Sequence, residues 1–135
     1  MPATYPHADL TRRIIGAAIE VHRQLGPGLL ESVYEQCLAQ ELSHAQIPHV
    51  RQAWVPITYR GEQLNTPLRI DLIVDSKVLV EIKSIASLAR IHDAQLLTYL
   101  KLAQIEVGLI INFNVPVLTD GVRRKVFTIK PLSDG

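Results

Sequence analysis

The segment from Leu68 to Lys83 constrains the fold more than any other part of the chain. It reads LRIDLIVDSKVLVEIK, two mostly apolar runs of strand length separated by the turn sequence Asp75-Ser76-Lys77. A connection this short joins antiparallel strands, because parallel strands need a crossover of roughly a dozen residues or more. The segment therefore predicts a hairpin, and its apolar character predicts that the hairpin is buried.

The remaining elements follow from hydrophobic periodicity and from glycine and proline. Helices are expected from Asp9 or Thr11 to the Gly26-Pro27 stop, from about Gly28 to Ala45, and over 87–104. Strands are expected over 50–59, 64–74, 78–83, 107–113 and 123–130, and Pro56 favours an edge position or a bulge for the first. The helix at 87–104 is long enough to make the next strand parallel. The order α-α-β-β-β-α-β-β predicts a mixed α/β sheet, an antiparallel meander plus one parallel crossover strand.

Composition limits the classes of protein that this chain can represent. A length of 135 residues fits one domain over 9–130, with a flexible lead-in at 1–8 and a tail at 131–135. A formal net charge of +1 excludes a histone-like protein, and the single cysteine, Cys37, excludes a disulfide framework or a cysteine-rich zinc fold. Neither a secretory signal nor a membrane-length apolar run is evident, so we expect a cytoplasmic protein without a membrane partner.

Three ionisable residues interrupt the apolar hairpin: Asp71, Glu81 and Lys83. Strand alternation places Glu81 and Lys83 on one face, and a hairpin symmetric about Ser76 places Asp71 opposite Glu81. A register slip of one residue would move Asp71 to the other face. The two carboxylates and the Ile82 carbonyl are oxygen ligands suited to Mg²⁺ or Mn²⁺, and Lys83 could serve an attacking water. A charge pair on a solvated face is the alternative interpretation.

Asp71 with Glu81-Ile82-Lys83 resembles the Asp and Glu-X-Lys signature of the PD-(D/E)XK nuclease superfamily, although Ile70 replaces the eponymous proline. The segment Gly28-Leu-Leu-Glu31-Ser-Val-Tyr34 resembles the pattern of the GxxExxY protein family, a bacterial and archaeal branch of that superfamily. Gln95-Leu-Leu-Thr-Tyr99 is similar to the Gln-X-X-X-Tyr motif of nucleases related to the bacterial recombination exonucleases. These motifs occur in the expected order on the expected elements.

The resemblance implies a restriction-endonuclease-like core and a role for each motif residue. Asp71 and Glu81 would bind the metal, Lys83 would serve the water, and Glu31 would help to hold the metal or its water. Gln95, Tyr99 and Tyr34 would line the site and contact substrate. Simpler roles stay open for these side chains: Glu31 stabilises a helix N-terminus, both tyrosines lie in the core, and Gln95 is an exposed helix former.

These patterns together predict a Mg²⁺-dependent nuclease that cleaves DNA with a metal-activated water. The main alternative is a catalytically silent member of the same fold that binds nucleic acid or protein. A small structural domain that dimerises through an apolar edge strand is a third possibility. We also expect a homodimer, because one small domain has little surface with which to hold a duplex.

Overall fold

A five-stranded mixed sheet forms the centre of the molecule in a computed structural model that describes residues 5–129. Its strands are β1 (His49–Val55), β4 (Leu68–Val74), β5 (Val78–Lys83), β6 (Val107–Asn112) and β7 (Val122–Val126), in the spatial order β1-β4-β5-β6-β7. β4 is antiparallel to β1 and β5, β6 is parallel to β5, and β7 is antiparallel to β6. The predicted mixed α/β class, with a meander and a parallel crossover, is therefore confirmed.

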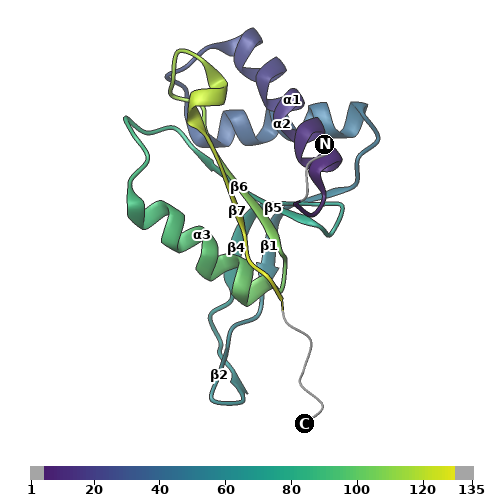
Figure 1. Cartoon of the computed structure of the whole chain (residues 1–135), viewed down its shortest axis with the longest axis vertical. Coiled ribbons are helices and arrows are strands. Elements are labelled where there is room, and N and C mark those ends of the chain that lie inside the picture. The colour runs from purple at the N-terminus through teal and green to yellow at the C-terminus, as the bar shows by residue number, and fades with distance from the viewer. Residues whose placement is uncertain (1–4, 130–135) are drawn as a thin grey trace.

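Helices cover both faces of this sheet (Figure 1). α1 (Ala8–Leu25) and α2 (Glu31–His44) pack on one face, and α3 (Arg90–Ala103) packs on the other. A 3₁₀ helix, η1 (Leu118–Gly121), precedes β7. Gly108 lets α3 approach β6 closely, because a Cβ atom there would lie 2.8 Å from Leu96 Cδ1.

Two apolar cores result from this layering. The first lies between the sheet and the pair α1 and α2, and in it the rings of Tyr34 and Phe113 stack with centroids 4.4 Å apart. The second lies between the sheet and α3, where Leu79 of β5 meets Leu96 and Leu100. β6 is buried along its whole length, as its continuous apolar run predicted. Within residues 5–129 no helix has the length and apolarity that a membrane crossing requires.

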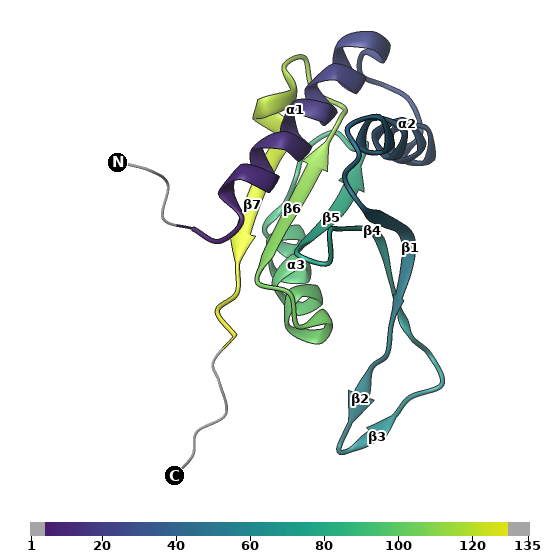
Figure 2. The same ribbon diagram turned by 90° about the vertical axis from the view of Figure 1, so that its right-hand side faces the viewer.

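A small hairpin of β2 (Thr58–Tyr59) and β3 (Glu62–Gln63) extends beyond the ends of β1 and β4 (Figure 2). The strands predicted at 50–59 and 64–74 are therefore interrupted, and the second begins only at Leu68. Pro56 and Pro67 lie at the interruptions, since proline has no N–H to donate to a ladder. β1 is an edge strand, as Pro56 predicted.

The structure corrects several predicted boundaries. α2 begins at Glu31 instead of Gly28, because Gly28 is left-handed (φ 97) and Leu30 is extended. Its buried face includes Tyr34, Leu38 and Leu42, whereas Leu30 is 74% exposed. α3 begins at residue 90 instead of 87, and β7 spans 122–126 instead of 123–130.

The N-terminal helix also begins differently from the prediction. α1 starts at Ala8, and Thr11 does not cap it, because the Thr11 hydroxyl donates a hydrogen bond to the carbonyl of His7 (2.9 Å). The helix ends at Leu25 and is capped by Gly26, whose positive φ (75) favours glycine, where the Gly26-Pro27 stop was predicted. The predicted tail at 131–135 and the first four residues of the predicted lead-in lie outside the described residues.

Candidate active site

The predicted register of the β4–β5 hairpin is confirmed. Val74 pairs with Val78 and Leu72 pairs with Val80, so the hairpin is symmetric about Ser76. Beyond Leu72 the side chains of Asp71 and Glu81 bridge the strands. The N–H of Asp71 donates to Glu81 Oε1 (3.1 Å), and the N–H of Ile82 donates to Asp71 Oδ2 (2.8 Å). Each carboxylate therefore accepts a backbone hydrogen bond from the opposite strand, and the two side chains meet in the gap between the strands.

A second interruption lies on the other side of Asp71, in the pairing of β1 with β4. Arg51 pairs with Leu72 and Ala53 pairs with Ile70, but Gln52 between them is left-handed (φ 50). Leu72 and Ile70 would share a face in a regular strand, yet they pack in the first and the second core respectively. The strands therefore rotate at Asp71, so this residue does not simply share the face of Glu81 as the symmetric hairpin predicted.

This rotation opens Asp71 to a cavity of about 490 Å³ beside the start of α2. Its lining includes Glu31, Gln52, Asp71, Ile82 and Ser84. Glu31 lies in the first turn of α2, and its Oε2 accepts a hydrogen bond from the N–H of Ser84 (3.1 Å). The Ser84 hydroxyl donates to the carbonyl of Leu29 (2.5 Å), so the loop before α2 is attached to the chain just after Lys83. Glu31, Asp71 and the Glu81–Lys83 segment are thus brought together.

Burial and like charge dominate the electrostatics of the cluster. Glu81 is only 9% exposed, and burial raises its pKa to about 7, with the charges of Asp71 and Glu31 acting in the same direction. The hydrogen bond from the Asp71 N–H and the charge of Lys83 lower that pKa, but by less. A second acid is affected, because burial and the charges of Glu81 and Asp71 raise the pKa of Tyr99. Tyr99 is thereby within electrostatic reach of both carboxylates.

The α3 motif residues lie beside this cluster, and the Tyr34 side chain does not. Gln95 Nε2 donates to the Tyr99 hydroxyl (2.8 Å), so these residues form one unit on α3. Tyr34 is fully buried; its hydroxyl donates to the carbonyl of Gly26 (2.6 Å) and accepts from the N–H of Leu29 (3.1 Å). The expected contact of Tyr34 with substrate is therefore corrected. Tyr34 instead holds the loop that leads into α2.

The oxygen atoms left over at the strand gap suit a hard cation. Across residues 5–129, no group of three His, Cys, Asp or Glu side chains is already arranged to hold a metal. Asp71 and Glu81 each use one carboxylate oxygen on a backbone N–H, and the hydrogen bonds within this range leave Asp71 Oδ1 and Glu81 Oε2 available. Two such oxygens with the Ile82 carbonyl match the oxygen preference of Mg²⁺ or Mn²⁺. Burial is the main cause of the raised pKa of Glu81, and a cation would relieve the repulsion from Asp71 that adds to it.

Two further polar residues, Glu35 and Asn112, support the site although the sequence assigned them no role in it. Glu35 is buried, accepts two hydrogen bonds from Arg51 (3.1 and 3.2 Å) and also accepts one from Gln52. Its spacing of one helical turn from Glu31 was the available signal. Asn112, at the end of β6 beside Lys83, holds Ile85 through both amide atoms (3.1 and 3.0 Å). A polar residue near the end of an apolar run was the clue there.

Comparison with known proteins gives one match that spans most of the chain. A family model described as the PD-(D/E)XK nuclease superfamily matches residues 8–125. No curated protein and no solved structure matches the chain significantly. The matched range extends from the start of α1 to the last residue but one of β7.

Proposed function

Because the chain belongs to the PD-(D/E)XK nuclease superfamily, we propose that it hydrolyses phosphodiester bonds of DNA at the Asp71–Glu81 cluster with a divalent metal ion. The observation that carries this proposal is the pair of carboxylates that bridge β4 and β5 with a free oxygen each. Two charged carboxylates held together, with Glu81 buried and Asp71 half-buried, destabilise a fold, so their presence in apolar strands favours a functional explanation.

Each residue of the cluster has a distinct task in this proposal. Asp71, Glu81 and the Ile82 carbonyl would hold Mg²⁺ or Mn²⁺, which when bound polarises the phosphate and lowers the pKa of a water. The Lys83 ammonium orients the attacking water and offsets the negative charge that develops on the phosphate. Glu31 helps to hold the ion or its water from α2. Gln95 and Tyr99 contact the substrate strand from α3.

Paired variants test this division of tasks. Asp71→Ala and Glu81→Ala each remove an oxygen ligand, so metal affinity and cleavage should fall together. Lys83→Ala should leave metal affinity unchanged or raised, because it removes a nearby positive charge, while cleavage falls by orders of magnitude. The measurements are divalent-metal titration and cleavage of labelled duplex, flapped and single-stranded DNA. Asp75→Ala is the matched control, since Asp75 is an aspartate of the hairpin turn that pairs only with Lys77 in the described range.

If no substrate is cleaved, DNA binding distinguishes the two alternative functions. Tight DNA binding without cleavage of any substrate would favour a silent nucleic-acid-binding member of the superfamily. Loss of both DNA binding and cleavage would leave a structural domain.

We also propose a homodimer, because one small domain has little surface with which to hold a duplex. Light scattering with and without DNA tests this proposal. Assignment to the GxxExxY branch follows from the resemblance that includes the Gly28–Tyr34 motif and stays a prediction.

A further inference from the structure

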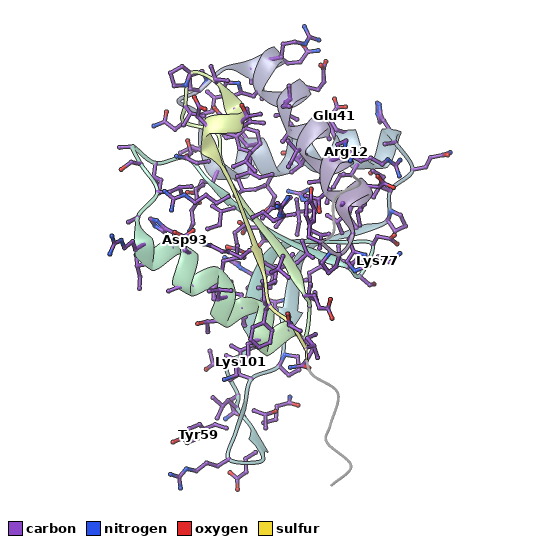
Figure 3. All side chains as sticks on the ribbon, viewed as in Figure 1. Arg12, Glu41, Tyr59, Lys77, Asp93 and Lys101 are labelled. Atoms are coloured by element: carbon purple, nitrogen blue, oxygen red, sulfur yellow. The ribbon has the colours of Figure 1, made fainter. Side chains whose placement is uncertain are left out.

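Beyond the carboxylate cluster, β1 and β4 continue into an extension to which the proposed nuclease site assigns no role. We call residues 53–70 the arm; it contains the ends of both strands and the β2–β3 hairpin, and it projects away from the helices (Figure 2). Trp54, the only tryptophan of the chain, is 64% exposed there, and Tyr59 near the tip is 62% exposed (Figure 3). Tyrosine and tryptophan are enriched at interaction surfaces, because each has an apolar body and a polar tip.

Each aromatic ring on the arm carries an arginine. Arg69 pairs with Trp54 across the strands, and its guanidinium lies 5.9 Å from the indole centroid. Arg60 lies 5.7 Å from the ring of Tyr59. Neither arginine has an ion-pair partner between residues 5 and 129, where the recorded pairs involve other cations. The arm therefore combines flat stacking surfaces with cations that are available to phosphate.

The Trp54–Arg69 pair lies on the same face as the site cavity. Ala53 and Ile70 pack in the core under α3, so Trp54 and Arg69, which alternate with them, point to the opposite face. Gln52 lines the site cavity together with residues of α2, which covers that opposite face. Trp54 is two residues farther along β1, which corresponds to roughly 7 Å.

We propose that Trp54 and Arg69 form a stacking platform for an unpaired base that flanks the scissile phosphate of the substrate strand. The inference rests on the proposed nuclease function and narrows its substrate to nucleic acid with a single-stranded portion. Bases stack on aromatic rings and guanidinium planes only where their faces are free, and a duplex covers those faces. A cavity of about 340 Å³ beside Trp54, which Gln63 and Asn65 also line, offers amide groups to the base edge.

A second copy of the chain is the other occupant to consider for this face. A two-fold interface joins the same patch of both copies, so the arm, with the cations Arg60 and Arg69 and the single carboxylate Glu62, would face an arm that carries the same excess of positive charge. Nucleic acid instead supplies phosphates to both arginines. Charge complementarity therefore favours a strand of nucleic acid.

The single tryptophan makes the platform directly observable. We would titrate the full chain, with Ca²⁺ in place of Mg²⁺, with oligothymidylate and with a blunt duplex, and record tryptophan emission and the anisotropy of a label on the nucleic acid. Stacking on Trp54 should quench emission, and single-stranded DNA should quench it at lower concentration than the duplex does. Cleavage of the same substrates in Mg²⁺ is measured in parallel.

Variants test whether stacking supplies affinity. Trp54→Leu and Arg69→Gln should each weaken binding of oligothymidylate about 10-fold, whereas Trp54→Phe, which retains a ring, should recover most of the affinity. Val117→Ala is the matched control, since Val117 is 56% exposed in the segment before η1, outside the arm. Circular dichroism confirms that each exposed-site variant folds.

The outcomes distinguish this proposal from the proposed function. Quenching without cleavage would support the platform and contradict the nuclease. Cleavage with unchanged tryptophan emission, or cleavage with equal losses of affinity in Trp54→Leu and Val117→Ala, would overturn the platform and leave the nuclease standing. An emission change that depends on protein concentration alone would assign the face to a second copy and would also overturn the platform.

Discussion

The two halves of the β4–β5 hairpin differ sharply although the same strands form both. Next to the turn, Leu72, Val74, Val78 and Val80 are fully buried and apolar, and the strands pair in regular register. At the open half, Asp71 replaces an apolar side chain and the carboxylates bridge the strands. The turn half gains free energy from burial, and the open half holds two like charges together. Stability in one half thus permits an unfavourable but reactive arrangement in the other.

The largest effect that this comparison predicts is on catalysis in the open half. Asp71→Asn should reduce cleavage by several orders of magnitude, since it removes the charge of a metal ligand. The free energy of unfolding should not decrease, because the substitution also removes a charge that repels Glu81. Cleavage assays and urea unfolding of the same preparation measure both. A variant that loses stability and keeps activity would break the comparison.

In the turn half we expect a substitution to lower stability and to leave cleavage unchanged. Leu79 is fully buried under α3, so Leu79→Ala should lower the free energy of unfolding by about 2–5 kcal/mol. Cleavage per folded molecule should remain close to that of the wild type. Val50→Ala, at a 57% exposed position of β1, is the control that should cost far less. Urea denaturation gives the difference, and equal losses would contradict the prediction.

The pH dependence of stability should show how unfavourable the charged form of Glu81 is in the open half. In the metal-free chain, Glu81 stays protonated up to about pH 7, whereas its ordinary pKa is 4.5. The folded state therefore binds the extra proton between these values, and stability falls as pH rises through this window and levels off above it. Glu81→Gln should remove this fall, which amounts to about 3 kcal/mol. Thermal unfolding in the presence of a chelator, at pH values from about 4 to about 8, tests this prediction.

The smallest predicted effect lies at the turn itself. Ser76 has a left-handed backbone (φ 55), which costs an L-residue other than glycine about 1 kcal/mol. Ser76→Gly should therefore stabilise the chain by about that amount and leave cleavage unchanged. Lys77→Ala, at the next position of the same turn, should not stabilise it. A loss of stability in Ser76→Gly would show that the serine side chain has an unrecognised role.

The sequence predicted the parts of the fold that depend on local chemistry. The register of Val74 with Val78 and of Leu72 with Val80 followed from the symmetric turn, because a register is fixed where apolar side chains on both strands must be buried. The end of α1 followed from Gly26-Pro27, and the parallel crossover followed from the length of the helix before β6.

The features that could not be predicted from the sequence depend on tertiary contacts. Nothing in the local sequence indicates that Gln52 is left-handed, yet this conformation lets Arg51 and Gln52 both reach Glu35. Tyr34 matched a motif position, but its burial depends on Phe113, which is distant in sequence. Periodicity alone does not fix which face of α2 is buried, because that depends on how the helix packs against the sheet.

The short turn between β4 and β5 also sets an order of events during folding. Asp71 and Glu81 are 10 residues apart, so their hairpin can close within about 1–10 μs. Pairing of β5 with β6 must wait for the crossover through α3, and such non-local contacts form more slowly. The two carboxylates therefore meet while water still solvates them, and only the arrival of β6 and α3 removes that water. We therefore expect Glu81 to take up a proton in a late step of folding, and we expect the rate of that step to depend on pH.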